Sequence, residues 1–183
     1  MRVYREYQLK NGKILVVRSA EKEDAQEELD MYKQQCCETP FLSRGPNDVF
    51  PTVESFVECY EDALKNDKSC YVVAIVDEKI IGSGHIEHYG GSSRVRHKCD
   101  VDLGILKDYW GLGIGGKIMQ TLLEVAEKVK LEQVELSVAS QNERAIKMYE
   151  SFGFEKFGTM PNSWKYEDGT YQDLLIMVKF FQK

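Results

Sequence analysis

Long apolar runs are missing from this sequence of 183 residues. None approaches the roughly 20 consecutive apolar residues that a helix needs to span a bilayer. The first residues, from Met1 to Glu6, also lack the apolar core of a secretory signal peptide. These absences predict a cytoplasmic protein with no membrane partner. The composition is that of a globular chain, and the length predicts a single domain over residues 1–183.

Disulfide and metal-binding patterns are missing as well. The five cysteines are odd in number, include the neighbours Cys36 and Cys37, and show no Cys-x-x-Cys spacing. We therefore expect reduced, buried thiols. The three histidines, His85, His88 and His97, are not spaced as metal ligands, so we expect no metal site.

The chain has no excess of basic residues. Its formal net charge of −6 argues against nucleic acid as a partner. The charge is uneven, because residues 21–62 hold 12 acidic side chains against 3 basic ones. This block is either the solvated face of helices or a surface that attracts a cationic amine.

Hydrophobic periodicity and turn residues divide the chain into alternating elements. Strands are expected over residues 13–18, 71–76, 79–89, 94–107, 134–138, 154–166 and 171–181, with a turn over 90–93. Helices are expected over residues 21–35, 52–65 and 142–152, and over a stretch that follows the glycine-rich segment and includes residues 118–129. Residues 39–51 hold three of the four prolines and predict a long loop, which is often functional. The order β-α-α-β-β-β-α-β-α-β-β predicts an α/β fold with a mixed sheet and helices on both faces.

Glycine is concentrated just before the third expected helix. Four of the fourteen glycines, Gly111, Gly113, Gly115 and Gly116, fall within six positions. Glycines at such a junction permit positive φ and a close approach of backbone to ligand. The helix that they open offers unpaired N–H groups and a positive dipole end. The segment therefore predicts a phosphate-bearing ligand held by the main chain.

Two common phosphate loops fit this segment poorly. The dinucleotide fingerprint G-x-G-x-x-G matches three of the glycines, but residues 107–110 separate them from the preceding strand. A Walker loop would end at Lys117, yet Ile118 stands where Ser or Thr must bind Mg²⁺. Lys117 is either a phosphate contact or a solvated lysine of the first helical turn. The helix that follows carries one apolar stripe, formed by Ile118, Leu122, Val125 and Val129.

Two motifs instead match one family. The first is Trp110-Gly111-Leu112-Gly113-Ile114-Gly115, against the pattern [Arg/Gln]-x-x-Gly-x-[Gly/Ala]. The second runs from Asn142 to Phe154, against Asn-x-x-Ala-x-x-x-Tyr-x-x-x-Gly-Phe. Together with the element order, they resemble the GNAT superfamily of acetyl-CoA-dependent N-acetyltransferases. The resemblance implies a single N-acetyltransferase domain whose sheet is splayed at the coenzyme A site.

The resemblance also implies the residues that bind acetyl-CoA as a cosubstrate, mostly through backbone N–H groups. These are Leu103, Ile105, Gly111, Leu112, Gly113, Ile114, Gly115, Gly116, Asn142, Ala145 and Ile146. Asn142, Ala145 and Tyr149 share one helical face by their spacing. Asn142 is a helix cap, a ligand contact, or both. The usual first-position Arg or Gln is Trp110 here, so a side-chain contact to phosphate is missing.

The implied mechanism is direct attack of an amine on the thioester. Tyr149 is expected to protonate the departing thiolate as the general acid. The expected base is Asp100, directly or through water, with Glu87 or solvent alone as alternatives. Asp100 shares a strand face with Asp102, and Glu87 shares one with His85.

These features predict an N-acetyltransferase acting on a primary amine, either a protein N-terminus or a small amine. A CoA-binding regulatory module without transferase activity is the alternative, although retention of Asn142 and Tyr149 argues against it. A nucleotide-binding protein using the near-Walker segment would bind ATP in competition with CoA. A homodimer is compatible with the sequence.

Overall fold

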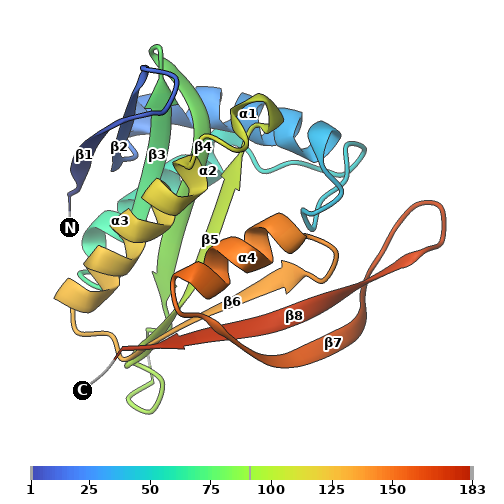
Figure 1. The fold of residues 1–183 in the computed structure, drawn as a ribbon. Helices are drawn as coiled ribbons and strands as arrows, with labels where there is room; N and C mark the ends of the chain where they lie inside the picture. Colours follow the sequence, from blue (N-terminus) through green and yellow to red (C-terminus); the bar gives the residue numbers. More distant parts are fainter. Residues whose placement is uncertain (1, 91, 182–183) are drawn as a thin grey trace.

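The computed structural model describes residues 2–90 and 92–181. One mixed sheet of eight strands lies at its centre, with α1 and α2 against one face and α3 and α4 against the other (Figure 1). The strands are β1 (Tyr4–Gln8), β2 (Ile14–Ser19), β3 (Cys70–Val76), β4 (Lys79–His88), β5 (Lys98–Ile105), β6 (Gln133–Ala139), β7 (Glu155–Lys165) and β8 (Tyr171–Phe180). The helices are α1 (Ala25–Glu38), α2 (Val53–Lys65), α3 (Ile114–Lys128) and α4 (Glu143–Ser151), with short 3₁₀ turns η1 (Lys22–Asp24) and η2 (Lys107–Tyr109).

The predicted α/β fold is confirmed, with one strand more than expected. Strand β1 pairs antiparallel with β2 at the edge of the sheet. Only Tyr7 of its five residues is partly buried. An edge strand with so little buried surface has no alternating apolar pattern, and the prediction therefore missed it.

Two element boundaries also differ from the prediction. The strand expected from residue 94 begins at Lys98, because residues 93–97 form turns, one closed by the Lys98 N–H donating to the Val95 carbonyl at 3.2 Å. The first helix begins at Ala25 rather than at residue 21 and extends to Glu38. The turn predicted over residues 90–93 includes Gly91, which lies outside the described residues.

Helix length and cysteine burial bear on two expectations from composition. Within the described ranges, the structure has no helix long and apolar enough to cross a membrane. All five cysteines are free thiols. Cys36, Cys70 and Cys99 are buried as expected, but Cys37 and Cys59 are exposed, so the expectation of burial is wrong for these two.

The sheet divides between β5 and β6. The strand order is β1-β2-β3-β4-β5-β6-β8-β7, and β5 and β6 form its one parallel pair among the described residues. That pairing covers three positions, from Lys98 opposite Gln133 to Asp100 opposite Glu135. Beyond Asp100, β5 continues along β4 to Ile105 without a partner on its other side. The predicted splay of the sheet is therefore confirmed.

Helix α3 anchors the side of the sheet on which the glycine-rich segment lies. Its predicted apolar stripe is buried at Ile118, Leu122 and Val125, whereas Val129 at the end of the helix is partly exposed. Gly84 of β4 lies so close beneath the helix that a Cβ there would be 2.7 Å from Ile118 Cγ2. The position of the helix mouth thus depends on this tight packing.

We expect Ile118→Ala to lower the free energy of unfolding by about 2–5 kcal/mol, because it leaves a cavity under a fully buried side chain. Chemical denaturation monitored by circular dichroism measures this loss. Glu127→Ala, on the exposed face of the same helix, should change the free energy of unfolding by less than about 0.5 kcal/mol. Equal losses in the two variants would contradict the packing described above.

Candidate active site

The glycine-rich segment forms the mouth of α3. Gly111 and Gly113 have φ of 78° and 82°, in the left-handed region that favours glycine. Gly113 is the N-cap, and its carbonyl accepts a hydrogen bond from the Lys117 N–H at 3.2 Å. The N–H groups of residues 114–116 therefore have no acceptor within the helix, and they lie at its positive dipole end. This is the geometry that a main-chain anion site requires.

Gly115 allows α3 to approach α4 closely. A Cβ at Gly115 would lie 3.0 Å from Met148 Sδ and 3.2 Å from Ile105 Cδ1. A Cβ at Gly116 would lie 3.8 Å from the Phe152 ring, an ordinary van der Waals contact. Gly115 thus provides room for packing, whereas Gly111 and Gly113 provide the backbone conformation.

The unpaired edge of β5 lies next to this helix mouth. The Leu106 N–H donates to the Ile81 carbonyl at 2.9 Å, toward β4. Because backbone groups alternate in direction along a strand, the N–H groups of Ile105 and Leu103 face the gap. The Ile105 carbonyl is not free, however, since it accepts a hydrogen bond from Trp110 Nε1 at 2.9 Å. The N–H groups of Leu103 and Ile105 therefore remain directed at the gap.

Trp110 also supports a basic side chain. The Arg144 guanidinium carbon lies 3.4 Å from the centre of the indole ring, so that the two groups stack. Partial burial lowers the pKa of Arg144. Lys117 points away from this loop, with its Nζ 4.8 Å from the ring centre of Tyr7. Of the two basic side chains, Arg144 and not Lys117 lies among the cleft residues.

Helix α4 presents most of its predicted residues to the same cleft. Asn142 caps the helix by accepting a hydrogen bond from the Ala145 N–H at 3.3 Å, and both residues line the cleft. Tyr149 also lines it and is only 8% exposed. Burial, together with the negative charge of Asp102, raises the pKa of Tyr149 well above its usual range. Ile146 is not part of this lining and packs against the hydrophobic core.

Two more predicted residues lie outside the lining. The Leu112 side chain borders a separate small pocket, which leaves its peptide group as the possible ligand contact. Asp100 lies where β5 and β6 still pair, opposite Glu135, whose carboxylate accepts a hydrogen bond from the Tyr89 hydroxyl at 3.2 Å. Burial raises the pKa of Asp100. Its role as the base stays a prediction.

One cleft of about 1460 Å³ joins these features. One half is bordered by α3, α4 and the open edge of β5. The other half is bordered by α1, α2, β4 and the loop over residues 39–51. The loop is therefore part of the cleft wall, as its proline content led us to expect.

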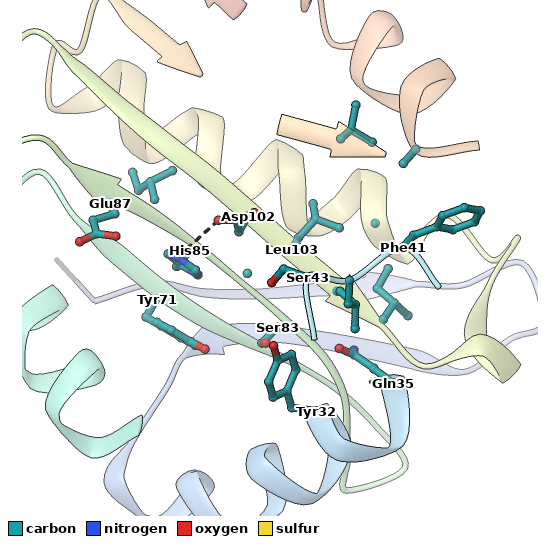
Figure 2. A pocket seen from close by; sticks show the side chains of 18 of the residues that line it. Tyr32, Gln35, Phe41, Ser43, Tyr71, Ser83, His85, Glu87, Asp102 and Leu103 are labelled. Carbon is teal, nitrogen blue, oxygen red and sulfur yellow. Dashed lines mark ion pairs between the residues drawn. The ribbon is translucent and has the colours of Figure 1, made fainter. Parts of the chain in front are cut away.

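Figure 2 shows the β4 and β5 side chains of the second half. Tyr71 of β3 stacks on His85, with ring centres 5.2 Å apart and planes 6° from parallel. His85 Nε2 lies 4.0 Å from Asp102 Oδ2, and Glu87 follows on the same face of β4. The cleft lining thus includes the carboxylates of Asp102, on the open part of β5, and of Glu87, on β4 opposite Asp100.

A buried carboxylate on α1 holds together the helices and the strand that pack next to these residues. Glu28 of α1 is 1% exposed and accepts hydrogen bonds from the hydroxyls of Tyr60 and Tyr71, the second at 2.7 Å. Burial raises the pKa of Glu28. Because Tyr60 is on α2 and Tyr71 on β3, one side chain connects three elements.

Comparison with known proteins identifies the family. The profile of the acetyltransferase (GNAT) family matches residues 29–154, which is more than half of the chain. The chain belongs to this family. The matched segment includes the glycine loop, the open edge of β5 and the Asn142-to-Phe154 motif.

Solved GNAT structures share the fold over nearly the whole chain. An acetyltransferase of the GNAT family from Streptococcus pneumoniae superposes with a TM-score of 0.86 at 27% identity, covering 91% of this chain and 99% of that one. A phosphinothricin acetyltransferase from Sinorhizobium meliloti, in complex with acetyl-CoA, gives a TM-score of 0.80 at 15% identity, covering 96% and 89%. The second likeness concerns the fold alone.

Curated relatives match over shorter segments. The L-amino acid N-acetyltransferase AaaT of Escherichia coli is 28% identical over 111 residues, which are 59% of this chain and 66% of that protein. N-alpha-acetyltransferase 50 of Danio rerio is 41% identical over 64 residues, 34% of this chain and 38% of that protein. The chain spans from about a quarter to two thirds of the length of such relatives.

Sequence reasoning missed two side chains of this GNAT cleft. Arg144 lies inside the quoted helical motif, but only the fold places it on Trp110, which is 34 positions away along the chain. The departure of Trp110 from the family pattern was the one available signal for it. Gln35, at the end of α1, also lines the cleft. No sequence pattern distinguishes Gln35 from its neighbour Gln34.

Proposed function

We propose that this protein is an acetyl-CoA-dependent N-acetyltransferase that acetylates a primary amine. One observation carries the proposal: the anion site at α3, the open edge of β5 and Tyr149 border one cleft. A CoA thioester needs a site for its diphosphate, a polar edge for its pantetheine arm and a proton donor near its sulfur. The cleft offers all three side by side.

The main chain supplies most of the groups that fit coenzyme A. The N–H groups of residues 111–116 hold the diphosphate, and the Leu103 N–H faces the pantetheine arm. Asn142 uses its side-chain oxygen as a cap, so its amide nitrogen is left to donate to the ligand. A site of backbone N–H donors at a helix N-terminus has the chemistry that a diphosphate requires.

Arg144 provides the cation that Trp110 does not. In the family pattern the first position of the loop is Arg or Gln, and here it is an indole ring. That ring holds the Arg144 guanidinium flat against it, at 3.4 Å, beside the glycine loop. We therefore assign to Arg144 the side-chain contact with the phosphates of CoA. A guanidinium is well suited to such contacts, because its planar donors match phosphate oxygens.

Different residues of the cleft then take part in different steps of the acetyl transfer. Acetyl-CoA supplies an acetyl group already activated as a thioester, and a neutral amine attacks its carbonyl carbon. As the new C–N bond forms and the C–S bond breaks, Tyr149 donates its proton to the sulfur. A tyrosine hydroxyl is protonated at neutral pH even at its ordinary pKa near 10, and burial raises the pKa of Tyr149 further, so the proton is present to be donated. The Leu103 N–H donates to the carbonyl oxygen, where negative charge develops.

A carboxylate accepts the proton that the amine loses. Asp100 is our proposed base, and it acts through water because its side chain lies outside the cleft lining. It is on the same strand face as Asp102, one step closer to the paired end of β5. The raised pKa of Asp100 suits a base better than an ordinary aspartate would. Glu87, which does line the cleft, is the alternative.

The names of two relatives are relevant to the identity of the acceptor amine. One acts on L-amino acids and the other is an N-alpha-acetyltransferase. They support an acceptor that is either a small amine or a peptide N-terminus.

We expect Tyr149→Phe to lower kcat by roughly 10²- to 10⁴-fold, because the departing thiolate loses its proton donor. Calorimetric titration with CoA should show little change in Kd. Tyr171→Phe, at an exposed tyrosine of β8, serves as the control and should retain full turnover. Unchanged kcat in Tyr149→Phe would remove this residue from the mechanism.

We expect Arg144→Ala to weaken CoA binding by roughly 10- to 100-fold, the usual effect of losing a charged hydrogen bond. Binding of pantetheine, which has no diphosphate, should be unchanged. Calorimetry measures both affinities. Lys147→Ala removes an exposed cation from the same helix and should have little effect.

A double variant sharpens this test. Trp110→Arg introduced into Arg144→Ala returns a cation to the loop, so we expect CoA affinity to recover. The same loss with CoA and with pantetheine would show that Arg144 supports the helix rather than the phosphates.

We expect a pH profile of kcat/KM to identify the base. An ordinary aspartate has a pKa near 4. Because the pKa of Asp100 is raised, its carboxylate becomes protonated at a higher pH than that as the solution is acidified. Activity should therefore decline on the acidic side at that higher pH in the wild type. Asp100→Asn should abolish this limb, whereas Glu87→Gln should leave it in place. The reverse result would make Glu87 the base.

A further inference from the structure

The side chain of Gln35 carries a buried hydrogen-bond donor that has no acceptor. The residue lies in the last turn of α1 and is 3% exposed. Across residues 2–90 and 92–181, its Nε2 atom is the one buried side-chain nitrogen or oxygen that finds no hydrogen-bond partner. The residue nevertheless lines the cleft. Figure 2 shows its amide directed from α1 into the pocket, on the side of Ser83.

An unpaired buried N–H group is costly. Leaving one unsatisfied costs the desolvation of that group with no hydrogen bond in return, and native proteins seldom do so without a reason. The fold holds the amide in place, because a Cβ on Gly104 would lie 2.7 Å from Gln35 Oε1 and 3.2 Å from Nε2. The missing side chain at position 104 thus makes space for this amide against β5.

The position of the amide indicates which substrate it meets. The Leu103 N–H points within the plane of the sheet, across the gap toward β6, where the thioester carbonyl is proposed to bind. Gln35 lies instead above the sheet, on the face covered by α1 and α2. That face borders the half of the cleft without the glycine loop. An oxygen that reaches Gln35 therefore belongs to the amine substrate rather than to the acetyl group.

We propose that the acceptor is an α-amino carbonyl compound, whose carbonyl oxygen accepts a hydrogen bond from Gln35 Nε2. The shared chemistry is an amine one carbon away from a carbonyl, as in a free amino acid or a peptide N-terminus. A polyamine has no oxygen and would leave the donor unpaired. This inference rests on the proposed transferase function and narrows its substrate class.

The surrounding side chains suit a large apolar substituent on such an acceptor. Tyr32 packs edge-on against Phe50 and Phe56, with ring centres 6.0 Å and 6.4 Å apart. All three rings line the cleft. Glu28 is not available to bind a second ammonium group, because two tyrosine hydroxyls already donate to it. Of the acidic side chains in residues 21–62, Glu28 is thus already satisfied within the fold.

The test compares two amines that differ in the carbonyl. Phenylalaninamide and phenethylamine share the ring and the amine, and only the first has an oxygen. We expect Gln35→Leu to lower the ratio of kcat/KM for phenylalaninamide over phenethylamine by roughly 10- to 100-fold. Comparing this ratio between wild type and variant cancels the different basicities of the two amines. Gln34→Leu, one position away on the exposed face, should leave the ratio unchanged.

Thermal unfolding separates a binding role from a structural one. Replacing an unpaired buried amide by leucine should not lower the Tm. An unchanged ratio in Gln35→Leu, or an equal fall in Gln34→Leu, would overturn the inference while leaving the transferase function intact. If the wild type acetylates no amine although it binds CoA, both the function and this inference fail.

The same assay distinguishes the two sources of the carbonyl. Phenylalanine, phenylalaninamide and a short peptide beginning with phenylalanine all carry the group that Gln35 recognises. The highest kcat/KM among them shows whether the acceptor is a free amino acid or a chain terminus. Equal loss for all three in Gln35→Leu supports the proposal, and loss for none contradicts it.

Discussion

The separation of β5 from β6 is the constraint on which the whole site depends. The two strands pair over three positions and then diverge, so that the second half of β5 has a free polar edge. Backbone N–H groups that face away from a neighbouring strand need another partner. Trp110 Nε1 donates to the Ile105 carbonyl, but the N–H groups of Ile105 and Leu103 still face the gap. The incomplete sheet thus leaves backbone donors directed at the cleft.

Packing between α3 and α4 places Tyr149 next to this opening. The absence of a side chain at Gly115 lets the first turn of α3 lie against Met148. Tyr149, the next residue of α4, lies in the lining of the same cleft. Glycine at position 115 therefore matters for how α4 and Tyr149 are placed, and not only for the conformation of the loop. The contact between α3 and α4 thus links the conformation of the glycine-rich segment to the position of Tyr149.

Much of the phosphate-binding half could be predicted from the sequence, because its determinants are local. Glycines at a strand-to-helix junction and an apolar stripe at helical spacing indicate α3 directly, and the spacing of Asn142, Ala145 and Tyr149 indicates one face of α4. The other half depends on contacts between distant segments.

No local pattern could reveal how those segments meet. The space that holds the Gln35 amide exists because Gly104, nearly 70 positions later, has no side chain. Ile146, predicted by motif to contact the cofactor, is partly buried against the core, and its contact with the cofactor stays a prediction. Strand β1 was missed for a simpler reason, since a strand exposed at a sheet edge carries no buried periodicity.

The single carboxylate of Glu28 has a consequence for how this protein changes over evolutionary time. Through two phenol hydroxyls it ties together α1, α2 and β3, and this junction does not include residues 39–51. Apart from Phe50, whose ring packs against Tyr32 of α1, that proline-rich loop can therefore change without disturbing the junction. We expect new specificities to arise there first, while Glu28 and its two tyrosines stay in place.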